Sequence, residues 1–206
     1  MARALEEYQK AIEYNDSNAD NYFNRGNVRL NEENFELAHQ DFEAAIERED
    51  RNAKFYHAKG LAFQAEAEKI ARSPEPDFEL EADKINSAII FFQSSLQYCN
   101  TFISSMFHLG LMYRRTEKFH EALQQFTKVQ ELLPNDKTIY IQRGLVYQDM
   151  GNHEYAIEDF KEAIQKDPEY ALSHFHMGVS KLKSKDIRSA IVDFNESLDL
   201  SLMFCT

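Results

Sequence analysis

The sequence of 206 residues predicts an all-α protein in which antiparallel helix pairs stack into a single array. Three observations indicate this fold class. Only 6 Gly and 4 Pro leave too little material for the many turns of an all-β chain. Glycines recur mostly at a spacing of 34 residues. Apolar residues recur at helical spacing on either side of short polar turns, and helices joined by such turns pack antiparallel.

The repeat is marked by small residues at fixed positions. Its glycines follow one another in steps of 34, 50, 34 and 34 residues and are Gly26, Gly60, Gly110, Gly144 and Gly178. Its alanines, each followed four residues later by Phe, are Ala38, Ala88, Ala122, Ala156 and Ala190. We expect the two helices of a pair to approach closely at these positions, where a larger side chain would cost about 1–3 kcal/mol.

These markers divide the chain into a half repeat and five helix pairs, about 11 helices in all. The half repeat, residues 1–18, has only the second helix of a pair, with Ala4, Tyr8 and Ala11 at the alanine, aromatic and small positions. The pairs cover residues 19–52, 53–102, 103–136, 137–170 and 171–206. One pair cannot bury its apolar faces alone, so we expect neighbouring pairs to stack.

The second pair carries 16 additional residues, at about residues 68–83. Its first helix is predicted to run on to about Arg72, because the segment has high helix propensity. Pro74 and Pro76 then break the helix. The result would be a lengthened acidic hairpin. It is either a tolerated surface insertion or a second contact surface for a basic partner.

This pattern resembles the tetratricopeptide repeat family over essentially the whole chain. The family's usual Trp is absent, and Leu202 stands at the last proline position. The resemblance implies a right-handed superhelix with a concave groove that binds peptides or partner helices. The strings that carry it are YFNRGNVRLNEENFELAHQDFEAAIERED, MFHLGLMYRRTEKFHEALQQFTKVQELLP and YIQRGLVYQDMGNHEYAIEDFKEAIQKDP.

In that family the groove is lined mainly by first-helix positions three before, one after and four after the glycine, with a rim position six before. The residues predicted to line it are Phe23, Asn27, Lys54, His57, Leu61, Phe107, Leu111, Arg114, Ile141, Leu145, Gln148, Phe175, Val179 and Leu182. Among them, the groove stripe is the apolar set Phe107, Leu111, Ile141, Leu145, Phe175, Val179 and Leu182. Lys54, His57, Arg114 and Gln148 are expected to select the partner. Either tight curvature buries the stripe, or it binds an amphipathic helix or apolar segment.

Charge and motifs exclude several classes of function. The net charge of −12 disfavours nucleic acid and anionic membrane surfaces, and no apolar run is long enough to span a membrane. No HExxH, GxGxxG, Walker or GxSxG motif occurs, and the SxxK match at Ser180–Lys183 lies in an amphipathic repeat helix and is read as chance. His174 and His176 are two residues apart, so they face away from each other on a helix and could not share a metal. We therefore expect no enzyme, no metal and no cofactor.

Two cysteines, Cys99 and Cys205, fit a reducing cytoplasmic location. A ciliary or trafficking complex is suggested by family analogy alone. The main hypothesis is a scaffold that binds a protein or peptide partner within a multiprotein assembly. The chain opens on half a repeat and ends without a polar capping helix. We expect either a fragment or short isoform of a longer array, or ends covered by partners or by self-association.

Two alternative functions remain at this stage. A chaperone adaptor would grip acidic C-terminal tails with a clamp of Lys, Asn and Arg. Asn24 and Asn27 match the asparagine places, but Phe23 stands at a lysine place, and Ser104 and His108 hold the third-repeat basic places. The second alternative is the substrate-recognition arm of a larger enzyme.

Overall fold

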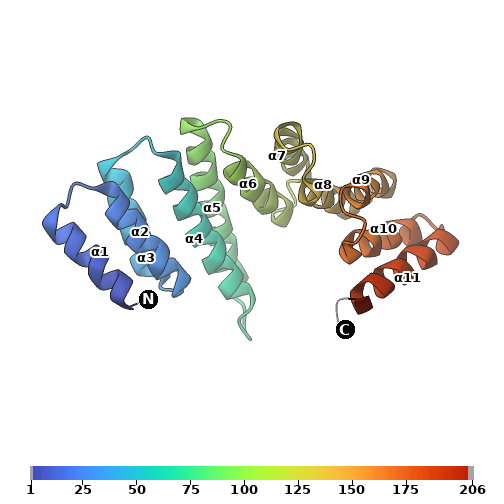
Figure 1. Cartoon of the computed structure of the whole chain (residues 1–206), viewed down its shortest axis with the longest axis horizontal. Coiled ribbons are helices and arrows are strands. Elements are labelled where there is room, and N and C mark those ends of the chain that lie inside the picture. Colours follow the sequence, from blue (N-terminus) through green and yellow to red (C-terminus); the bar gives the residue numbers. More distant parts are fainter. Residues whose placement is uncertain (1, 204–206) are drawn as a thin grey trace. The chain divides into compact units, whose positions relative to one another are not determined.

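The computed structural model describes residues 2–203, which form eleven α-helices and contain no strand (Figure 1). Cys205 lies outside the described residues. The helices are α1 Ala2–Tyr14, α2 Ala19–Asn31, α3 Phe35–Arg48, α4 Ala53–Ala71, α5 Phe78–Tyr98, α6 Ile103–Arg115, α7 Phe119–Leu132, α8 Lys137–Asp149, α9 His153–Lys166, α10 Ala171–Lys183 and α11 Ile187–Met203. We call α2, α4, α6, α8 and α10 the first-type helices, because each opens a predicted pair. The others are second-type helices.

The helices divide into two compact units, Met1–Met112 and Tyr113–Thr206, with the division inside α6. Unit 1 contains the half-repeat helix α1 and the pairs α2–α3 and α4–α5. Unit 2 contains α7 and the pairs α8–α9 and α10–α11. Each predicted pair interval holds two helices.

The core of unit 1 lies between successive helix pairs. One cluster joins α1, α2, α3 and α4 through Ile12, Ala19, Tyr22, Ala45, Ile46 and Phe55. A second joins Ala38 and Phe42 to Ala58 and Ala62 of α4. The core of unit 2 is built the same way, from Tyr140, Ile141, Ala156, Phe160, Ala163 and Met177.

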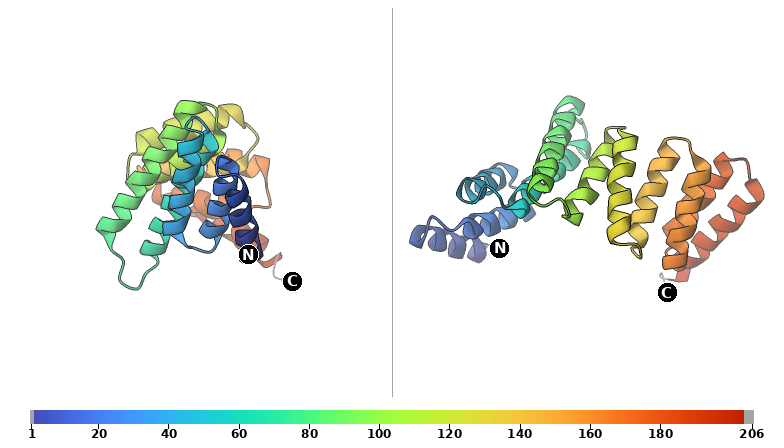
Figure 2. Two further views of the ribbon diagram at one scale, coloured as in Figure 1. Left: turned by 90° about the vertical axis from the view of Figure 1, so that its left-hand side faces the viewer. Right: turned by 90° about the horizontal axis from the view of Figure 1, so that it is seen from above.

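The inserted residues lengthen the second pair, as the helix propensity and the prolines predict. Helix α4 ends at Ala71 with Arg72 as its C-cap, and α5 begins at Phe78 behind the N-cap Asp77. These are the two longest of the eleven helices, at 19 and 21 residues. Their hairpin extends past the ends of α2 and α3 (Figure 2).

Four turns within helix pairs place a residue in the left-handed region at one repeat position, seven after the glycine. These residues are Glu33 (φ 55°), Glu117 (φ 58°), Gly151 (φ 75°) and Lys185 (φ 67°). Only Gly151 adopts such a φ without a steric cost from Cβ. The left-handed conformation at this turn position is therefore kept even where the residue is not glycine.

The close approach predicted at the repeat glycines is confirmed. A Cβ placed on Gly60 would lie 2.7 Å from Cε1 of Phe92, and on Gly144 it would lie 2.8 Å from Cε1 of Phe160. Gly26 and Gly178 face the rings of Phe42 and Phe194 in the same way. The phenylalanine ring thus rests on the bare backbone of its own first-type helix.

Gly60→Ala should lower the free energy of unfolding by about 1–3 kcal/mol, because the added methyl overlaps the ring of Phe92. Chemical denaturation followed by circular dichroism measures the loss. In a Phe92→Leu background the same Gly60→Ala change should cost less, since the overlapping ring is gone. Strictly additive losses in the double variant would contradict this packing.

Candidate partner-binding groove

The groove-facing positions of unit 2 lie on α8 and α10. Gln148, near the end of α8, donates hydrogen bonds from Nε2 to the carbonyl oxygen of His176 at 2.9 Å and to Oγ of Ser180 at 2.7 Å. These bonds hold the two first-type helices side by side. Gln148 therefore positions the groove wall and has its amide engaged within the chain.

The apolar groove residues of unit 2 differ in exposure. Phe175 and Leu182 are 44% and 47% exposed. Leu145 and Val179 are half-buried. Ile141 is only 7% exposed and belongs to the core cluster with Met177, so its side chain is not available to a partner. The accessible apolar surface of this unit's groove is carried by α10.

The groove positions of unit 1 are mostly half-buried. Phe23 packs its ring against Phe55, with the centroids 5.2 Å apart, and against Phe42 at 6.2 Å. The others in this class are Asn27, Leu61, Phe107 and Leu111. Lys54 is exposed in the first turn of α4. The seven members of the groove stripe are thus divided between the two units.

A buried polar chain connects α4 and α5 to α6. Ser95 donates to the carbonyl oxygen of Ala53 at 2.8 Å, and Ser105 donates to Ser95 Oγ at 2.8 Å. Nδ1 of His57 lies 3.0 Å from Oγ of Ser105. Because the Ser105 proton goes to Ser95, Nδ1 of His57 is the donor in this contact. His57 is thus a member of an internal network.

The remaining polar groove residue, Arg114, forms an ion pair with Asp149, whose Oδ2 lies 2.5 Å from Nε. Both side chains are partly exposed. Three of the four polar groove residues therefore contact neighbouring helices of the protein itself. Sequence reasoning expected them to select a partner, and no contact in the structure tests that role.

A histidine–phenylalanine stack recurs in both units and was missed by sequence reasoning. His108 stacks on Phe92 with the ring centroids 5.6 Å apart and 24° between planes. His176 stacks on Phe160 at 5.7 Å and 23°. Each histidine lies two residues before a repeat glycine. The recurrence of His at that position was the signal that could have revealed the stack.

Burial keeps these histidines neutral. Burial and, to a smaller extent, the nearby His108 lower the pKa of His57 to about 4. Burial likewise lowers the pKa of His108 and of His176, and Arg114 adds to the effect at His176. The groove therefore gains no positive charge from these side chains near neutral pH.

Buried ion pairs recur at a further pair of repeat positions. Arg143, one before the glycine, binds Asp159, one before the phenylalanine, through two hydrogen bonds of 2.8 and 2.6 Å. Arg25 binds Asp41 at the same two positions in the first pair. Asp41 and Asp159 are almost completely buried. These ion pairs join the two helices of one repeat, so their charges are neutralised within the fold.

No helix among the described residues is both long and apolar enough to cross a membrane. Residues 2–203 likewise contain no cluster of three His, Cys, Asp or Glu side chains that could hold a metal ion.

The stacked helix pairs, close-packed at glycine and phenylalanine, define a helical repeat protein. Tetratricopeptide repeat profiles match residues 7–40, 103–136 and 138–170. The chain belongs to the tetratricopeptide repeat family.

Curated relatives and solved structures agree with this family. The chain is 23% identical over 200 residues to stress-induced-phosphoprotein 1 of Caenorhabditis elegans, covering 87% of this chain. It is 24% identical over 220 residues to Hsp70-Hsp90 organizing protein 3 of Arabidopsis thaliana, covering 96% of this chain. It spans 61% and 39% of the lengths of these two relatives. YrrB, described as a TPR protein with an unusual peptide-binding site, superposes with a TM-score of 0.75 at 21% identity, covering 95% of this chain and 93% of YrrB.

Acidification should destabilise the protein through His57. The unfolded histidine has a pKa near 6.5, and its folded pKa is about 4. Between these values the unfolded chain binds a proton that the folded chain does not, so stability falls as the pH falls.

From pH 7 to pH 5, urea unfolding of wild type should therefore show a steeper loss than His57→Gln, by up to about 1.4 kcal/mol per pH unit. The glutamine keeps a donor for Ser105 but does not titrate. Parallel pH profiles for the two proteins would contradict the neutral buried histidine.

Proposed function

We propose that this chain is a non-enzymatic scaffold whose groove in unit 2 binds an amphipathic helix or an apolar extended segment of a partner protein. The tetratricopeptide repeat fold supports a role in protein–protein interaction. The single observation that carries the finer proposal is the exposure of Phe175 and Leu182 on α10, seven residues apart on one helix face.

The reason for preferring an apolar ligand is physical. Large apolar side chains lie about half exposed on a common face. Binding that removes them from water stabilises the complex by roughly 25 cal/mol per Å² of apolar surface buried. Val179 and Leu145 lie half-buried at the neighbouring groove positions and extend the same surface. Gln148 holds α8 against α10. A partner would thus meet a surface that is already formed.

The groove can be tested with a displayed library of amphipathic helical peptides selected against wild type. We expect selected peptides to carry apolar residues at i, i+3 or i+4, and i+7. Their affinity should fall at least about tenfold for Phe175→Glu plus Leu182→Glu, because the carboxylates would be desolvated in the complex.

Leu132→Glu is the matched control, since Leu132 is 44% exposed but lies on the second-type helix α7. Circular dichroism checks that all variants keep their helices. Peptides that bind the double variant as tightly as wild type would refute the groove proposal.

A second candidate function, a chaperone adaptor that binds acidic C-terminal tails, is favoured by the similarity to an Hsp70-Hsp90 organizing protein. The groove chemistry of unit 1 favours it less. Phe23 stands at the place of a clamp lysine, half-buried and packed against the unit 1 core, and His108 is neutral with Nδ1 2.9 Å from Oε1 of Gln64. Carboxylate recognition would lack the charge-assisted bonds that make it strong.

An acidic peptide with a free C-terminal carboxylate should accordingly show no saturable binding below about 1 mM in a calorimetric titration. The same peptide with an amidated C-terminus serves as the control. Binding that is lost on amidation and weakened by salt would instead establish the adaptor function.

A further inference from the structure

In the first helix pair, two arginines of α2 share one buried carboxylate of α3. Arg25 lies one residue before Gly26, and Arg29 lies three residues after it. Nη2 of Arg25 is 2.6 Å from Oδ1 of Asp41, and Nη1 of Arg29 is 2.7 Å from Oδ2. The two arginine side chains are only 12% and 19% exposed. Two largely buried positive charges therefore meet a single negative charge.

The corresponding carboxylates of the fourth and fifth pairs each have one cationic partner. Arg143, one before the glycine, binds Asp159 through its Nε–Nη2 fork, and the position three after the glycine is Tyr147. In the fifth pair the cation is Lys181, three after the glycine, at 2.7 Å from Asp193. Only the first pair has a cation at both positions. It therefore holds one guanidinium more than its aspartate can neutralise.

The two arginines of the first pair use different edges of their guanidinium groups. Arg25 donates to Asp41 from Nε and Nη2, at 3.0 and 2.6 Å. Arg29 uses Nη1 alone, which contacts Asp41 and donates to the carbonyl oxygen of Leu37 at 3.3 Å. Within residues 2–203 the Nε–Nη2 fork of Arg29 has no partner. Such a fork of two parallel N–H groups matches the two oxygens of a carboxylate.

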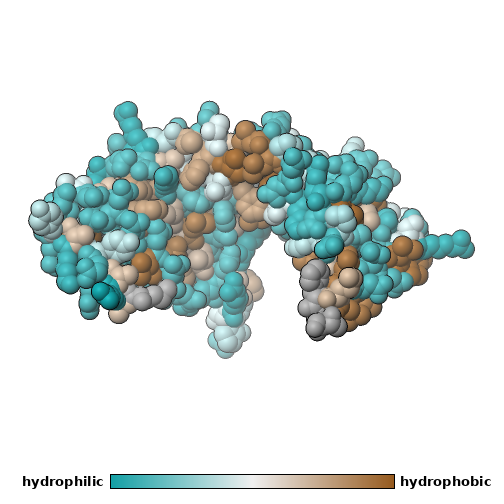
Figure 3. Space-filling view, viewed as in Figure 1, coloured by the Kyte–Doolittle hydropathy of each residue, from teal (hydrophilic) through white to brown (hydrophobic). Residues whose placement is uncertain are grey.

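Arg25 and Arg29 line a pocket of about 470 Å³, which we call the α1–α2 pocket. Helices α1 and α2 lie side by side (Figure 1). The surface over α1 is mainly hydrophilic (Figure 3). The remaining residues that line the pocket all belong to α1 and are Leu5, Glu6, Gln9, Lys10 and Glu13.

The carboxylates of α1 leave the fork of Arg29 open. Glu13 accepts a hydrogen bond from Nε2 of Gln9 at 2.9 Å, and Oε1 of Gln9 accepts one from Nη1 of Arg25. A neutral amide thus stands between this glutamate and the arginines. In the part of the chain that the structure describes, neither Glu6 nor Glu13 forms an ion pair with Arg29.

The charge of Arg29 is only partly compensated. Burial lowers the pKa of Arg29; Asp41 opposes this effect, and Arg25 adds to it. An anion at the fork would supply the missing compensation. A carboxylate suits the site better than a phosphate, because the fork is planar and the net charge of −12 repels a dianion more strongly than a monoanion.

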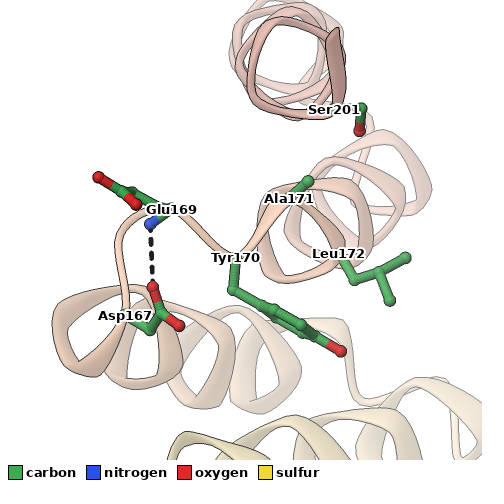
Figure 4. A pocket seen from close by; sticks show the side chains of 6 residues that line it. All are labelled: Asp167, Glu169, Tyr170, Ala171, Leu172 and Ser201. Carbon is green, nitrogen blue, oxygen red and sulfur yellow. Dashed lines mark hydrogen bonds between the residues drawn. The ribbon is translucent and has the colours of Figure 1, made fainter. Parts of the chain in front are cut away.

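A pocket in unit 2 has the opposite chemistry. About 440 Å³ in volume, it lies between the start of α10 and the end of α11 (Figure 4). Asp167 accepts the backbone N–H of Glu169 at 3.2 Å and pairs with Lys137. None of its described lining residues is cationic, so this pocket would repel an anion. These residues are Asp167, Glu169, Tyr170, Ala171, Leu172 and Ser201.

We propose that the α1–α2 pocket is a binding site for a carboxylate group, which the Nε–Nη2 fork of Arg29 holds through two hydrogen bonds. The site lies outside the groove, because the groove positions are one and four residues after the repeat glycine and Arg29 is three after it. The proposal is therefore independent of the function proposed for the groove.

The first test titrates sodium acetate into the full chain at pH 7, with sodium chloride keeping the ionic strength constant. We expect the Nε–H signal of Arg29 and the backbone amide signals of α1 and α2 to shift saturably in ¹H–¹⁵N spectra. The dissociation constant should lie in the millimolar range, at about 1–50 mM. Capped glutamate, with its backbone amine acetylated and its backbone carboxyl amidated, is the second probe. Its binding would assign the site to acidic side chains of proteins, and binding of acetate alone would assign it to small free acids.

Arg29→Lys keeps the positive charge but removes the fork, so the affinity for acetate should fall at least about tenfold. Arg51→Lys is the matched control, because Arg51 is exposed in the turn between α3 and α4, and this variant should bind as wild type does. Amide spectra check that both variants keep the fold. The Nε–H signal of Arg29 in wild type reports on the site even if Arg29→Lys unfolds.

Four results would overturn the proposal. The first is an Arg29 signal that does not saturate up to about 100 mM acetate. The second is equal acetate affinity of wild type and folded Arg29→Lys. The third is inorganic phosphate that binds more tightly than acetate, because the ligand class would then be wrong. The fourth is acetate binding that tightens at least about tenfold in Glu6→Gln plus Glu13→Gln, because a carboxylate of the chain itself would then occupy the fork.

Discussion

The contact between a bare glycine backbone and a phenylalanine ring sets the geometry on which the remaining structure depends. With no Cβ on Gly60, the ring of Phe92 reaches the α4 backbone, and the same contact recurs in at least three other pairs. It fixes how deeply one helix of a pair sits on the other. The same ring also meets the next pair, as Phe160 does when it stacks on His176. One side chain thus joins the packing within a repeat to the packing between repeats.

Around this constant contact the polar contacts vary from repeat to repeat. The first and fourth pairs use a buried Arg–Asp bridge, whereas the second places Lys59 over the ring of Phe91, 4.7 Å from its centroid. The His–Phe stack occurs where the third and fifth pairs begin. Each of these contacts engages a charged or polar side chain within the chain itself. A surface for a partner is therefore defined by what each repeat leaves exposed, which in unit 2 is chiefly α10 and α11.

Features that depend on residue size at a fixed sequence interval could be predicted from the sequence. Features that depend on where a neighbouring helix places its side chains could not. The Gly60–Phe92 contact and the end of α4 near Arg72 followed from spacing and from Pro74. Ile141 was placed in the groove by register alone, but Met177 and the neighbouring core bury it. Gln148 and His57 looked available to a ligand, because nothing in their local sequence reveals the serine or carbonyl oxygen on the next helix that they contact. How the two units combine into one groove stays a prediction.

The within-pair turns show how strongly the helices govern the loops. Glu33, Glu117 and Lys185 hold positive φ angles that suit glycine, and they do so at the same step of the repeat. Non-glycine residues in such conformations cost on the order of 1 kcal/mol each. At all three sites the contacts between the helices outweigh this cost, so each helix pair forms whatever residue stands at the turn. These three sites are consequently open to engineering: glycine at these exposed turn positions would relieve the backbone strain and would leave the groove residues of α8 and α10 unchanged.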